Sequence, residues 1–312
     1  MSSVDKHLWP ILIAGPTASG KSALALAIAE RAGGTVINAD SMQVYSELRV
    51  LTARPSAEDE ARAPHALYGF VPAREAYSAG RFVRDAAEAI AQARRAGRRP
   101  IIVGGTGLYF KALLEGLSPI PEVREDVRAY WRNEAAGYGA EALHQELSRR
   151  DPVMAARLQP SDVQRIVRAL EVLESSGRSL AEWQALKGGP VLREAETFRF
   201  VVSVERAELH ARADQRFARM IDEGAMAEVR ALSDMQLDEG LPAMRAIGVK
   251  PLIRYSRGEV DLGGAVEAAQ AETRQYIKRQ ETWLKSHMIS WMPVKTKEME
   301  RSMRDIFAFI QR

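Results

Sequence analysis

A glycine-rich loop near the amino terminus constrains this 312-residue chain more than any other feature. The motif consists of Gly15, Pro16, Thr17, Ala18, Ser19, Gly20, Lys21 and Ser22. It follows an apolar run at Leu8–Ala14 and opens a predicted helix from Lys21 to about Ala32. A buried strand, such a loop and a helix in this order place backbone N–H groups and a helix N-terminus around a phosphate group. The segment therefore predicts a P-loop in an α/β fold.

The side chains of this loop fit a bound diphosphate. Lys21 would add a positive charge beside the phosphates, and the hydroxyl of Ser22 is a candidate ligand for Mg²⁺. Thr17 and Ser19 either hydrogen-bond the diphosphate or only shape the turn. A glycine turn without a ligand is the plain alternative, and the flanking strand and helix argue against it.

The order of apolar runs predicts a parallel sheet covered by helices. Further strands are expected at Thr35–Ala39, Pro100–Gly104, Thr197–Val204 and Ile289–Val294. Helices are expected at about Arg81–Gly97, Gly107–Gly116 and Gly264–His287, with amphipathic helices between residues 205 and 263 and an irregular stretch between residues 40 and 80. Strands that alternate with helices are typical of such a sheet. The fold class is therefore α/β, a P-loop NTPase-like parallel sheet flanked by helices.

A second domain is predicted inside this sheet domain. Residues 119–195 give one helical pattern after another, interrupted by prolines and glycines, and no convincing strand. We therefore expect residues 1–118 and 196–312 to form the P-loop core. Residues 119–195 would form a helical insertion domain.

Composition excludes several classes of protein. The chain has no cysteine, which rules out disulfides, thiolate metal sites and cysteine nucleophiles and is compatible with the cytoplasm. No segment reaches the roughly 18 apolar residues of a membrane span, so we expect no membrane partner. Lys and Arg number 44 against 41 Asp and Glu, a net charge of +3 that is compatible with a polyanionic partner.

The acidic residue nearest to the loop is not where a nucleotide hydrolase would carry it. An ATPase or GTPase has an acidic residue at the end of a second apolar strand, where it helps to hold Mg²⁺. Here the strand Pro100–Gly104 continues into Gly105 and Thr106, whereas Asp40 follows the strand Thr35–Ala39. Asp40 would thus lie at the carboxyl edge of the sheet, where α/β proteins bind ligands. Taken alone, it is equally an aspartate in a solvated turn.

Several motifs together resemble the bacterial tRNA dimethylallyltransferases. They occur in the order of that family and span almost the whole chain. The runs are Gly15–Ser22, Asp40–Tyr45, Leu51–Pro55, Ala63–His65, Val103–Ala112, Gln164–Leu173, Glu228–Arg230, Arg245–Lys250 and Thr273–Trp283.

The resemblance implies a reaction between dimethylallyl diphosphate and tRNA. The donor's diphosphate would lie in the loop Gly15–Ser22, with Mg²⁺ on Ser22. N6 of the adenine immediately 3′ of the anticodon would attack the allylic carbon. Asp40 would accept a proton or hydrogen bond from N6, as a general base does. Lys21 and Arg216 would stabilise the departing diphosphate, and Thr106 would contact the target nucleotide.

The same resemblance implies a tRNA-binding surface on both domains. Gln164 and Arg168 fall on one face of a predicted helix, although an ion pair of Arg168 with Glu171 is an open alternative. The basic residues near the carboxyl terminus are interleaved with aromatic ones, which suits RNA and equally a charged, solvent-facing helix. The expected tRNA contacts are Asp40, Ser41, Met42, Gln43, Thr106, Arg128, Gln164, Arg165, Ile166, Val167, Arg168, Arg245, Lys250, Arg274, Lys278 and Arg279.

Two positions depart from the family pattern, and three other functions compete. Val249 stands where the family usually has Tyr, which puts one RNA contact in doubt, and Ile277 where it often has Ala. The three alternative functions are a P-loop kinase or ATPase, an isopentenyltransferase for free adenine nucleotides, and a non-catalytic RNA-binding protein. The expected enzyme is a cytoplasmic monomer whose partner is the anticodon stem-loop of tRNA.

Overall fold

The chain forms two compact units in the computed structural model, which describes residues 5–186, 188–295, 297 and 299–311. One unit combines residues 1–114 with 191–312, and the other comprises residues 115–190. Both limits of the second unit lie before the predicted positions 119 and 195. The reason at its far end is that the amides of Val191 and Leu192 bond to the carbonyl of Leu113, which ties this segment to the larger unit.

The larger unit contains a six-stranded sheet in which every pair of neighbours is parallel. The strands in spatial order are β3 (His65–Ala66), β2 (Gly34–Asn38), β4 (Arg99–Gly104), β1 (Ile11–Ala14), β5 (Phe198–Val202) and β6 (Met292–Val294). Ile11 in β1 lies opposite Ile101 in β4 and Phe198 in β5. The predicted α/β fold with a parallel sheet is confirmed, and five of its strands overlap the five apolar runs.

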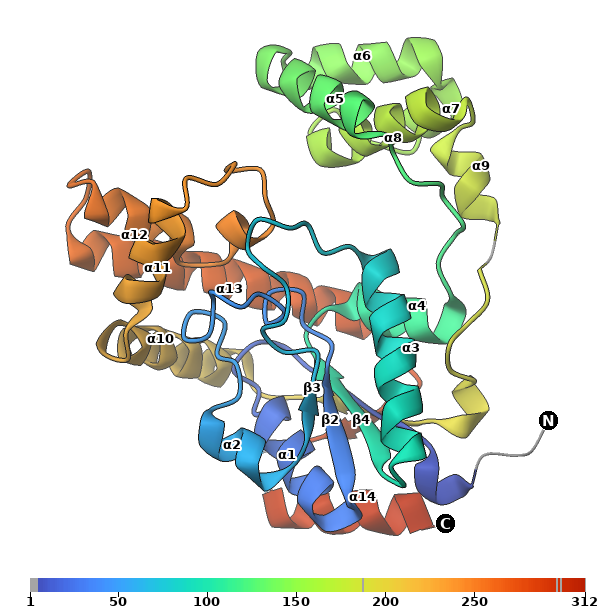
Figure 1. The fold of residues 1–312 in the computed structure, drawn as a ribbon, viewed down its shortest axis with the longest axis vertical. Coiled ribbons are helices and arrows are strands. Elements are labelled where there is room, and N and C mark those ends of the chain that lie inside the picture. Colours follow the sequence, from blue (N-terminus) through green and yellow to red (C-terminus); the bar gives the residue numbers. More distant parts are fainter. Residues whose placement is uncertain (1–4, 187, 296, 298, 312) are drawn as a thin grey trace. The chain divides into compact units, whose positions relative to one another are not determined.

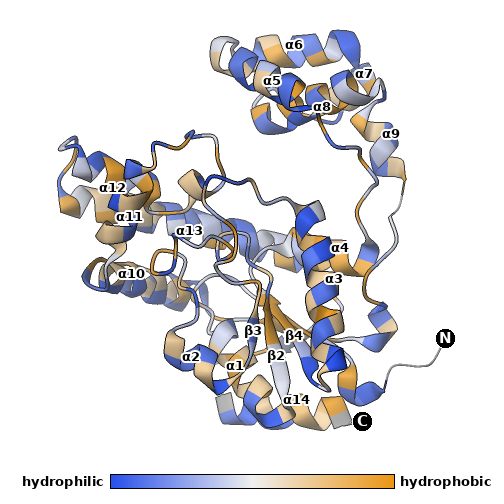
Figure 2. Cartoon of the chain, viewed as in Figure 1, coloured by the Kyte–Doolittle hydropathy of each residue, from blue (hydrophilic) through white to orange (hydrophobic). Residues whose placement is uncertain are grey.

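Helices cover both faces of the sheet (Figure 1). On one face, α1 (Lys21–Ala32) and α14 (Met299–Gln311) pack with Ile11 and Ile13 of β1. On the other, α3 (Ala79–Arg95) and α4 (Gly107–Glu115) pack with Leu12 and Ala14. Side chains alternate between the faces of a strand, so a strand buried on both sides is apolar throughout. Figure 2 shows β4 mostly in the hydrophobic colour, whereas α3 shows both colours.

The carboxyl-terminal part of this unit adds four further helices. They are α10 (Arg206–Asp222), α11 (Ala225–Asp234), α12 (Val249–Ser256) and α13 (Leu262–His287). Arg274 on α13 donates to both carboxylate oxygens of Asp214 on α10, at 2.8 and 2.9 Å. This ion pair, in which the arginine contacts both carboxylate oxygens, holds α13 against α10.

The smaller unit consists of helices around their own core. They are α5 (Glu125–Gly137), α6 (Ala140–Arg150), α7 (Pro152–Ala155), α8 (Val163–Ser176) and α9 (Leu180–Ala185). Trp131, Leu147, Ile166 and Leu170 belong to its buried cluster. The strand-free pattern predicted for this region agrees with these helices.

Three elements of the structure were not predicted from the sequence. The stretch expected to be irregular contains α2 (Ala57–Arg62) and the two-residue strand β3, both too short to show a period. The helix α14 was also not predicted. Short 3₁₀ turns complete the fold at Lys6–Leu8, Glu194–Glu196 and Ala243–Arg245. Among the described residues, no helix is both long and apolar enough to span a bilayer.

The carboxyl ends of β1, β2 and β4 meet closely at one edge. The amide of Ala39, just after β2, donates to the carbonyl of Val103 in β4 at 2.8 Å. Gly104 then passes directly against the Ala39 backbone, where a Cβ would overlap the Ala39 carbonyl group. Only glycine permits this approach.

We expect Gly104→Ala to lower the free energy of unfolding of the larger unit by about 1–3 kcal/mol or more, because overpacking shifts backbone. Urea unfolding followed by circular dichroism measures the change. Gly80→Ala is the control, because Gly80 lies in α3 with only ordinary contacts around an added Cβ. Equal unfolding midpoints for the two variants would contradict this account of the sheet edge.

Candidate active site at the carboxyl edge of the sheet

The P-loop runs from the end of β1 into α1 as predicted. Gly20 is the N-cap of α1 with φ of 84°, a left-handed conformation that glycine adopts without strain. No side chain caps this helix end. Its first N–H groups, together with the helix dipole, thus form a site for an anion. The Ser22 side chain, in the first turn, is exposed.

Lys21 lies among the other charges of the site. Its Nζ donates to the carbonyl of Pro16 at 3.2 Å. Removal from water lowers the pKa of Lys21 to about 8, while the Asp40 carboxylate raises it and the Arg216 guanidinium lowers it further. Three charged groups from distant parts of the sequence are therefore close enough to influence one another.

Asp40 is held in place by the end of β2. The buried Asn38 accepts from the Asp40 amide at 2.8 Å and donates to the Asp40 carbonyl at 2.9 Å. The carboxylate atom Oδ1 accepts from the amide of Met42 at 2.9 Å. Within the described part of the chain, Oδ2 has no hydrogen-bond partner. One oxygen thus orients the carboxylate and the other is free to accept a proton.

Thr106 links the end of β4 to the residue after Asp40. Its Oγ1 accepts from the Ser41 amide at 3.1 Å and donates to the Ser41 hydroxyl at 3.4 Å. Its own amide donates to the carbonyl of Ala39 at 3.3 Å. Its hydroxyl is engaged with Ser41 in this structure, and the contact of Thr106 with the target nucleotide stays a prediction.

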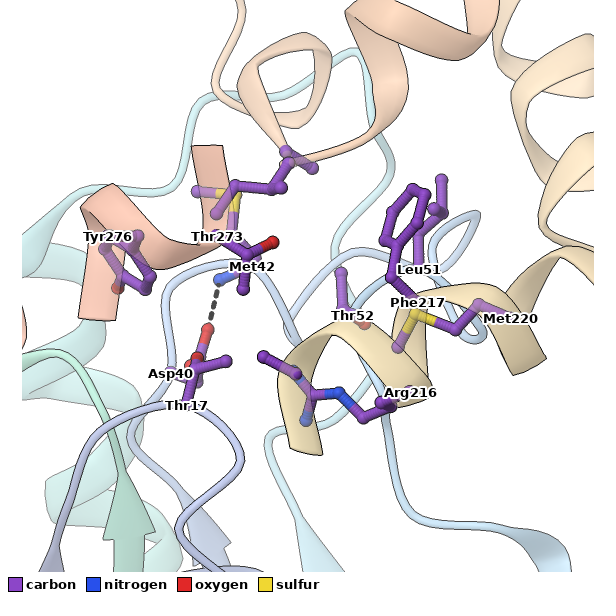
Figure 3. Close-up of a pocket in the computed structure, with 13 residues that line it drawn as sticks. Thr17, Asp40, Met42, Leu51, Thr52, Arg216, Phe217, Met220, Thr273 and Tyr276 are labelled. Carbon is purple, nitrogen blue, oxygen red and sulfur yellow. Dashed lines mark hydrogen bonds between the residues drawn. The ribbon is translucent and has the colours of Figure 1, made fainter. Parts of the chain in front are cut away.

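A pocket lies between the P-loop, the segment after β2 and helix α10 (Figure 3). Thr17, Asp40 and Arg216 supply polar groups to one part of its wall, and the side chain of Arg216 extends from α10. Burial lowers the pKa of Arg216 and Asp40 opposes this shift, but a guanidinium remains charged. Arg216 forms no hydrogen bond or salt bridge with any residue that the structure describes. The remaining lining residues are Met42, Leu51, Thr52, Ala213, Phe217, Met220, Ala246, Ile247, Thr273 and Tyr276.

Glu228 on α11 anchors the loop that carries Leu51 and Thr52 into this pocket. Its carboxylate accepts from three consecutive amides, those of Arg49, Val50 and Leu51, at 2.8, 2.6 and 3.0 Å. From the other side of the loop, the Gln43 side chain donates to the carbonyls of Thr52 and Ala53 at 2.8 and 2.9 Å. Gln43, predicted to contact tRNA, therefore has its amide group committed to this loop.

Helix α13 supplies two residues that the site prediction missed. Gln280 accepts from the Thr17 amide at 2.8 Å and donates to the Gly105 carbonyl at 3.0 Å. Loss of water raises the pKa of Tyr276, which lines the pocket; the Asp40 carboxylate raises it further, and the neighbouring side chains of Thr106 and Gln280 oppose the shift. A signal existed in the sequence. Gln280 falls on the stripe of buried positions Ala265, Ala269, Thr273, Ile277, Gln280 and Leu284, and a glutamine on such a stripe needs buried partners.

The residues predicted to bind tRNA fall into two groups. Arg245, Lys250, Lys278 and Arg279 in the larger unit, and Gln164 and Arg165 in the smaller one, are exposed. Arg274 is paired with Asp214, and the alternative left open for Arg168 is present, with Glu171 at 3.4 Å. Arg128 also has a neighbouring partner, Glu125 at 2.8 Å.

The prediction for Ile166 needs correction. Its side chain is fully buried in the core of the helical unit, and Val167 packs against the same cluster. Ile166 therefore stabilises the helical unit from inside its core, whereas the half-buried Val167 keeps part of its side chain at the surface. Val249 and Ile277, the two departures from the family pattern, are also fully buried.

Comparisons with known proteins place this site in a family. A family model described as IPP transferase matches residues 43–287, and one described as Isopentenyl transferase matches residues 10–65. The chain belongs to the IPP transferase family. Relatives in this family include the tRNA dimethylallyltransferase of Parvibaculum lavamentivorans, 50% identical over 301 residues, which are 96% of this chain and 95% of that protein. The tRNA dimethylallyltransferase of Azorhizobium caulinodans is 53% identical over 282 residues, 90% of each.

Solved structures agree with this membership of the IPP transferase family. The full-length tRNA isopentenylpyrophosphate transferase of Bacillus halodurans superimposes with a TM-score of 0.69 at 30% identity, and the match covers 97% of each chain. A eukaryotic dimethylallyltransferase acting on tRNA gives a TM-score of 0.77 at 26% identity, covering 91% of this chain and 73% of that one.

The lowered pKa of Lys21 predicts proton uptake when inorganic diphosphate binds. The bound anion favours the ammonium form and so raises this pKa above about 8. Below pH 8 Lys21 is already charged, so its contribution to the affinity is complete there and is lost as the pH rises above 8. Calorimetry at pH 8.5 in buffers of different ionisation enthalpy measures the uptake. Lys21→Arg is the control, because its side chain stays protonated; equal uptake by both proteins would contradict the assignment.

Proposed function

We propose that this protein transfers the dimethylallyl group of dimethylallyl diphosphate to N6 of the adenine immediately 3′ of the anticodon in tRNA, releasing diphosphate. One observation carries the proposal. The carboxylate of Asp40, with Oδ2 free, shares a pocket with Thr17 of the P-loop and with Arg216. An acceptor group for an amine thus stands beside a site for a diphosphate. The names of relatives about 50% identical over nearly the whole chain support the same reaction.

The two parts of the donor would contact different parts of the pocket. Its diphosphate would lie against the P-loop amides, Lys21 and Arg216, which together offset its negative charge. The short branched hydrocarbon would lie against the apolar wall, which includes Met42, Leu51 and Phe217. Positive groups fixed in place stabilise the charge that develops on the leaving diphosphate, without reorganisation during the reaction.

The transfer step is a nucleophilic displacement. The lone pair of N6 forms a bond to the carbon that bears the diphosphate, and the carbon–oxygen bond breaks with its electrons leaving on the diphosphate. A proton passes from N6 to Oδ2 of Asp40. The neutral amine is a weak nucleophile, so accepting its proton as the bond forms lowers the barrier. The amide of Met42 keeps the carboxylate oriented through Oδ1.

The residues present fit a magnesium ion bound mainly through the substrate. The Ser22 hydroxyl is exposed at the start of α1, and the described residues contain no cluster of three His, Cys, Asp or Glu side chains. Mg²⁺ commonly takes one or two protein ligands together with substrate phosphates and water. Ser22 would hold the ion, which when bound neutralises charge on the diphosphate.

The acceptor that fits best is structured RNA. Exposed cations lie on both units, among them Arg165, Arg245 and Lys278, and a free mononucleotide has no use for charges on a separate helical unit. An adenine must leave its stack to reach a pocket, at a cost of a few kcal/mol that contacts to the flanking backbone offset. The proposal includes a monomer that acts in the cytoplasm.

We expect Asp40→Asn to slow a single turnover of prenyl transfer by about 10²–10⁴-fold, the range for a lost general base. The affinity for inorganic diphosphate should be retained or rise, because the asparagine keeps the bond to Met42 while the repulsion between the carboxylate and the anion is lost. Rapid-quench assays with a radiolabelled donor and an anticodon stem-loop give the rate. The proposed role of Asp40 would fail if the variant reacted at the wild-type rate.

The choice of acceptor is tested by competition. Stem-loop RNA with adenine just 3′ of the anticodon is incubated together with AMP, dimethylallyl diphosphate and Mg²⁺, and products are identified by mass spectrometry. We expect prenyl adenosine in the RNA and almost none in AMP. Comparable prenylation of AMP would replace the tRNA proposal by the free-nucleotide alternative, and ATP hydrolysis without any prenyl product would favour a P-loop hydrolase.

A further inference from the structure

Helix α13 contacts the P-loop through the buried polar side chain of Gln280. Gln280 is 5% exposed. Its Oε1 accepts the Thr17 N–H at 2.8 Å, and its Nε2 donates to the Gly105 carbonyl at 3.0 Å. The two backbone partners lie just beyond the ends of β1 and β4. One side chain from the carboxyl-terminal part of the chain therefore bridges the loop after one strand to the loop after its neighbour.

This bridge depends on the chemistry of an amide. Its two backbone partners are a donor and an acceptor, and a neutral amide offers one group of each kind. A carboxylate would place an oxygen against the Gly105 carbonyl, and an apolar side chain would leave both backbone groups without partners. Apolar packing supports the same crossing, since Ile277, one turn earlier on α13, belongs to a buried cluster that Ala18 of the P-loop packs against.

The bridge continues toward Asp40. Tyr276 on α13 lies beside both Gln280 and Thr106, whose side chains each oppose the rise of its pKa that burial causes. The Thr106 hydroxyl in turn accepts from the amide of Ser41 at 3.1 Å, the residue after Asp40. Hydrogen bonds at Gln280 and at Thr106, with Tyr276 close to both side chains, therefore link the P-loop amide of Thr17 through α13 to the segment that carries the proton acceptor.

We infer that Gln280 is a positioning residue that holds the P-loop backbone at Thr17 in register with Asp40. The inference rests on the proposed function, in which donor and acceptor react across this pocket. Gln280 does not touch either substrate in this account. It fixes the distance between the diphosphate site and the amine site, and a misplacement of about 1 Å between reacting groups can cost roughly 100-fold in rate.

The test compares Gln280→Met and Gln280→Glu with Gln275→Met. Methionine has a similar length but forms neither bond, and glutamate keeps only the acceptor. Gln275 is exposed on the same helix, so its variant makes the same chemical change away from the bridge. Hydrogen exchange of the Thr17 amide, followed by mass spectrometry in the absence of ligands, reports the bridge directly. We expect faster exchange in Gln280→Met only.

The kinetic readout separates positioning from binding. At saturating donor and stem-loop, Gln280→Met should lower the single-turnover rate by about 100-fold, and Gln280→Glu by at least about tenfold. The dissociation constants of Mg²⁺-diphosphate and of the stem-loop should each change less than about threefold. Rates are normalised to the fraction of protein that binds diphosphate, so loss of folded protein does not imitate the effect.

Each alternative outcome overturns the inference in its own way. An unchanged rate, or unchanged exchange at Thr17, would show that the bridge does not position the loop. A diphosphate affinity that falls in proportion to the rate would make Gln280 a binding residue. Absence of prenyl product with the wild-type protein would defeat the proposed function itself, together with this inference.

Discussion

The close approach of three parallel strand ends is the constraint on which the site depends. Gly15, after β1, donates to the carbonyl of Gly104 at 3.3 Å, and Thr106, after β4, donates to the carbonyl of Ala39 at 3.3 Å. The P-loop, Asp40 and Thr106 are consequently joined at one edge through backbone bonds. Because Gly104 has no side chain, the segment after β2 comes close enough for Asp40 to enter the P-loop pocket.

Electrostatics then assigns the two substrates to opposite parts of that pocket. Lys21 and Arg216 are two cations near a single carboxylate, and partial removal from water disfavours their charged forms. An arriving anion relieves this imbalance. A bound anion and Asp40 would repel each other, which supports the proposal that the diphosphate lies at the loop and the neutral amine at the carboxylate. This division matches a displacement in which negative charge leaves on one side and a proton on the other.

The sequence predicted those elements that are determined by residues close together in the chain. The strand before Gly15, the loop and α1 follow from neighbouring residues, and so do most of the sheet and the helical unit. Elements too short for a period, α2 and β3, were missed.

The surroundings of the other site residues are formed by distant parts of the chain, and a local sequence pattern does not predict them. Arg216 is one of several arginines on α10, and nothing in its neighbourhood distinguishes it without the family resemblance. Arg274 was expected at the RNA surface but pairs with Asp214, and Ile166 was expected there but is buried. Gln280 alone left a usable signal, as a glutamine on a buried stripe.

In the proposed reaction, one pocket holds the diphosphate and the amine together. The most direct measurement is a crystal structure of the protein with the stem-loop and a donor analogue whose bridging oxygen is replaced by sulfur, which slows transfer. We predict the diphosphate against Gly15–Ser22, N6 of the flipped adenine hydrogen-bonded to Asp40, and the allylic carbon between them. An adenine bound away from Asp40, or a diphosphate bound outside the P-loop, would contradict the account.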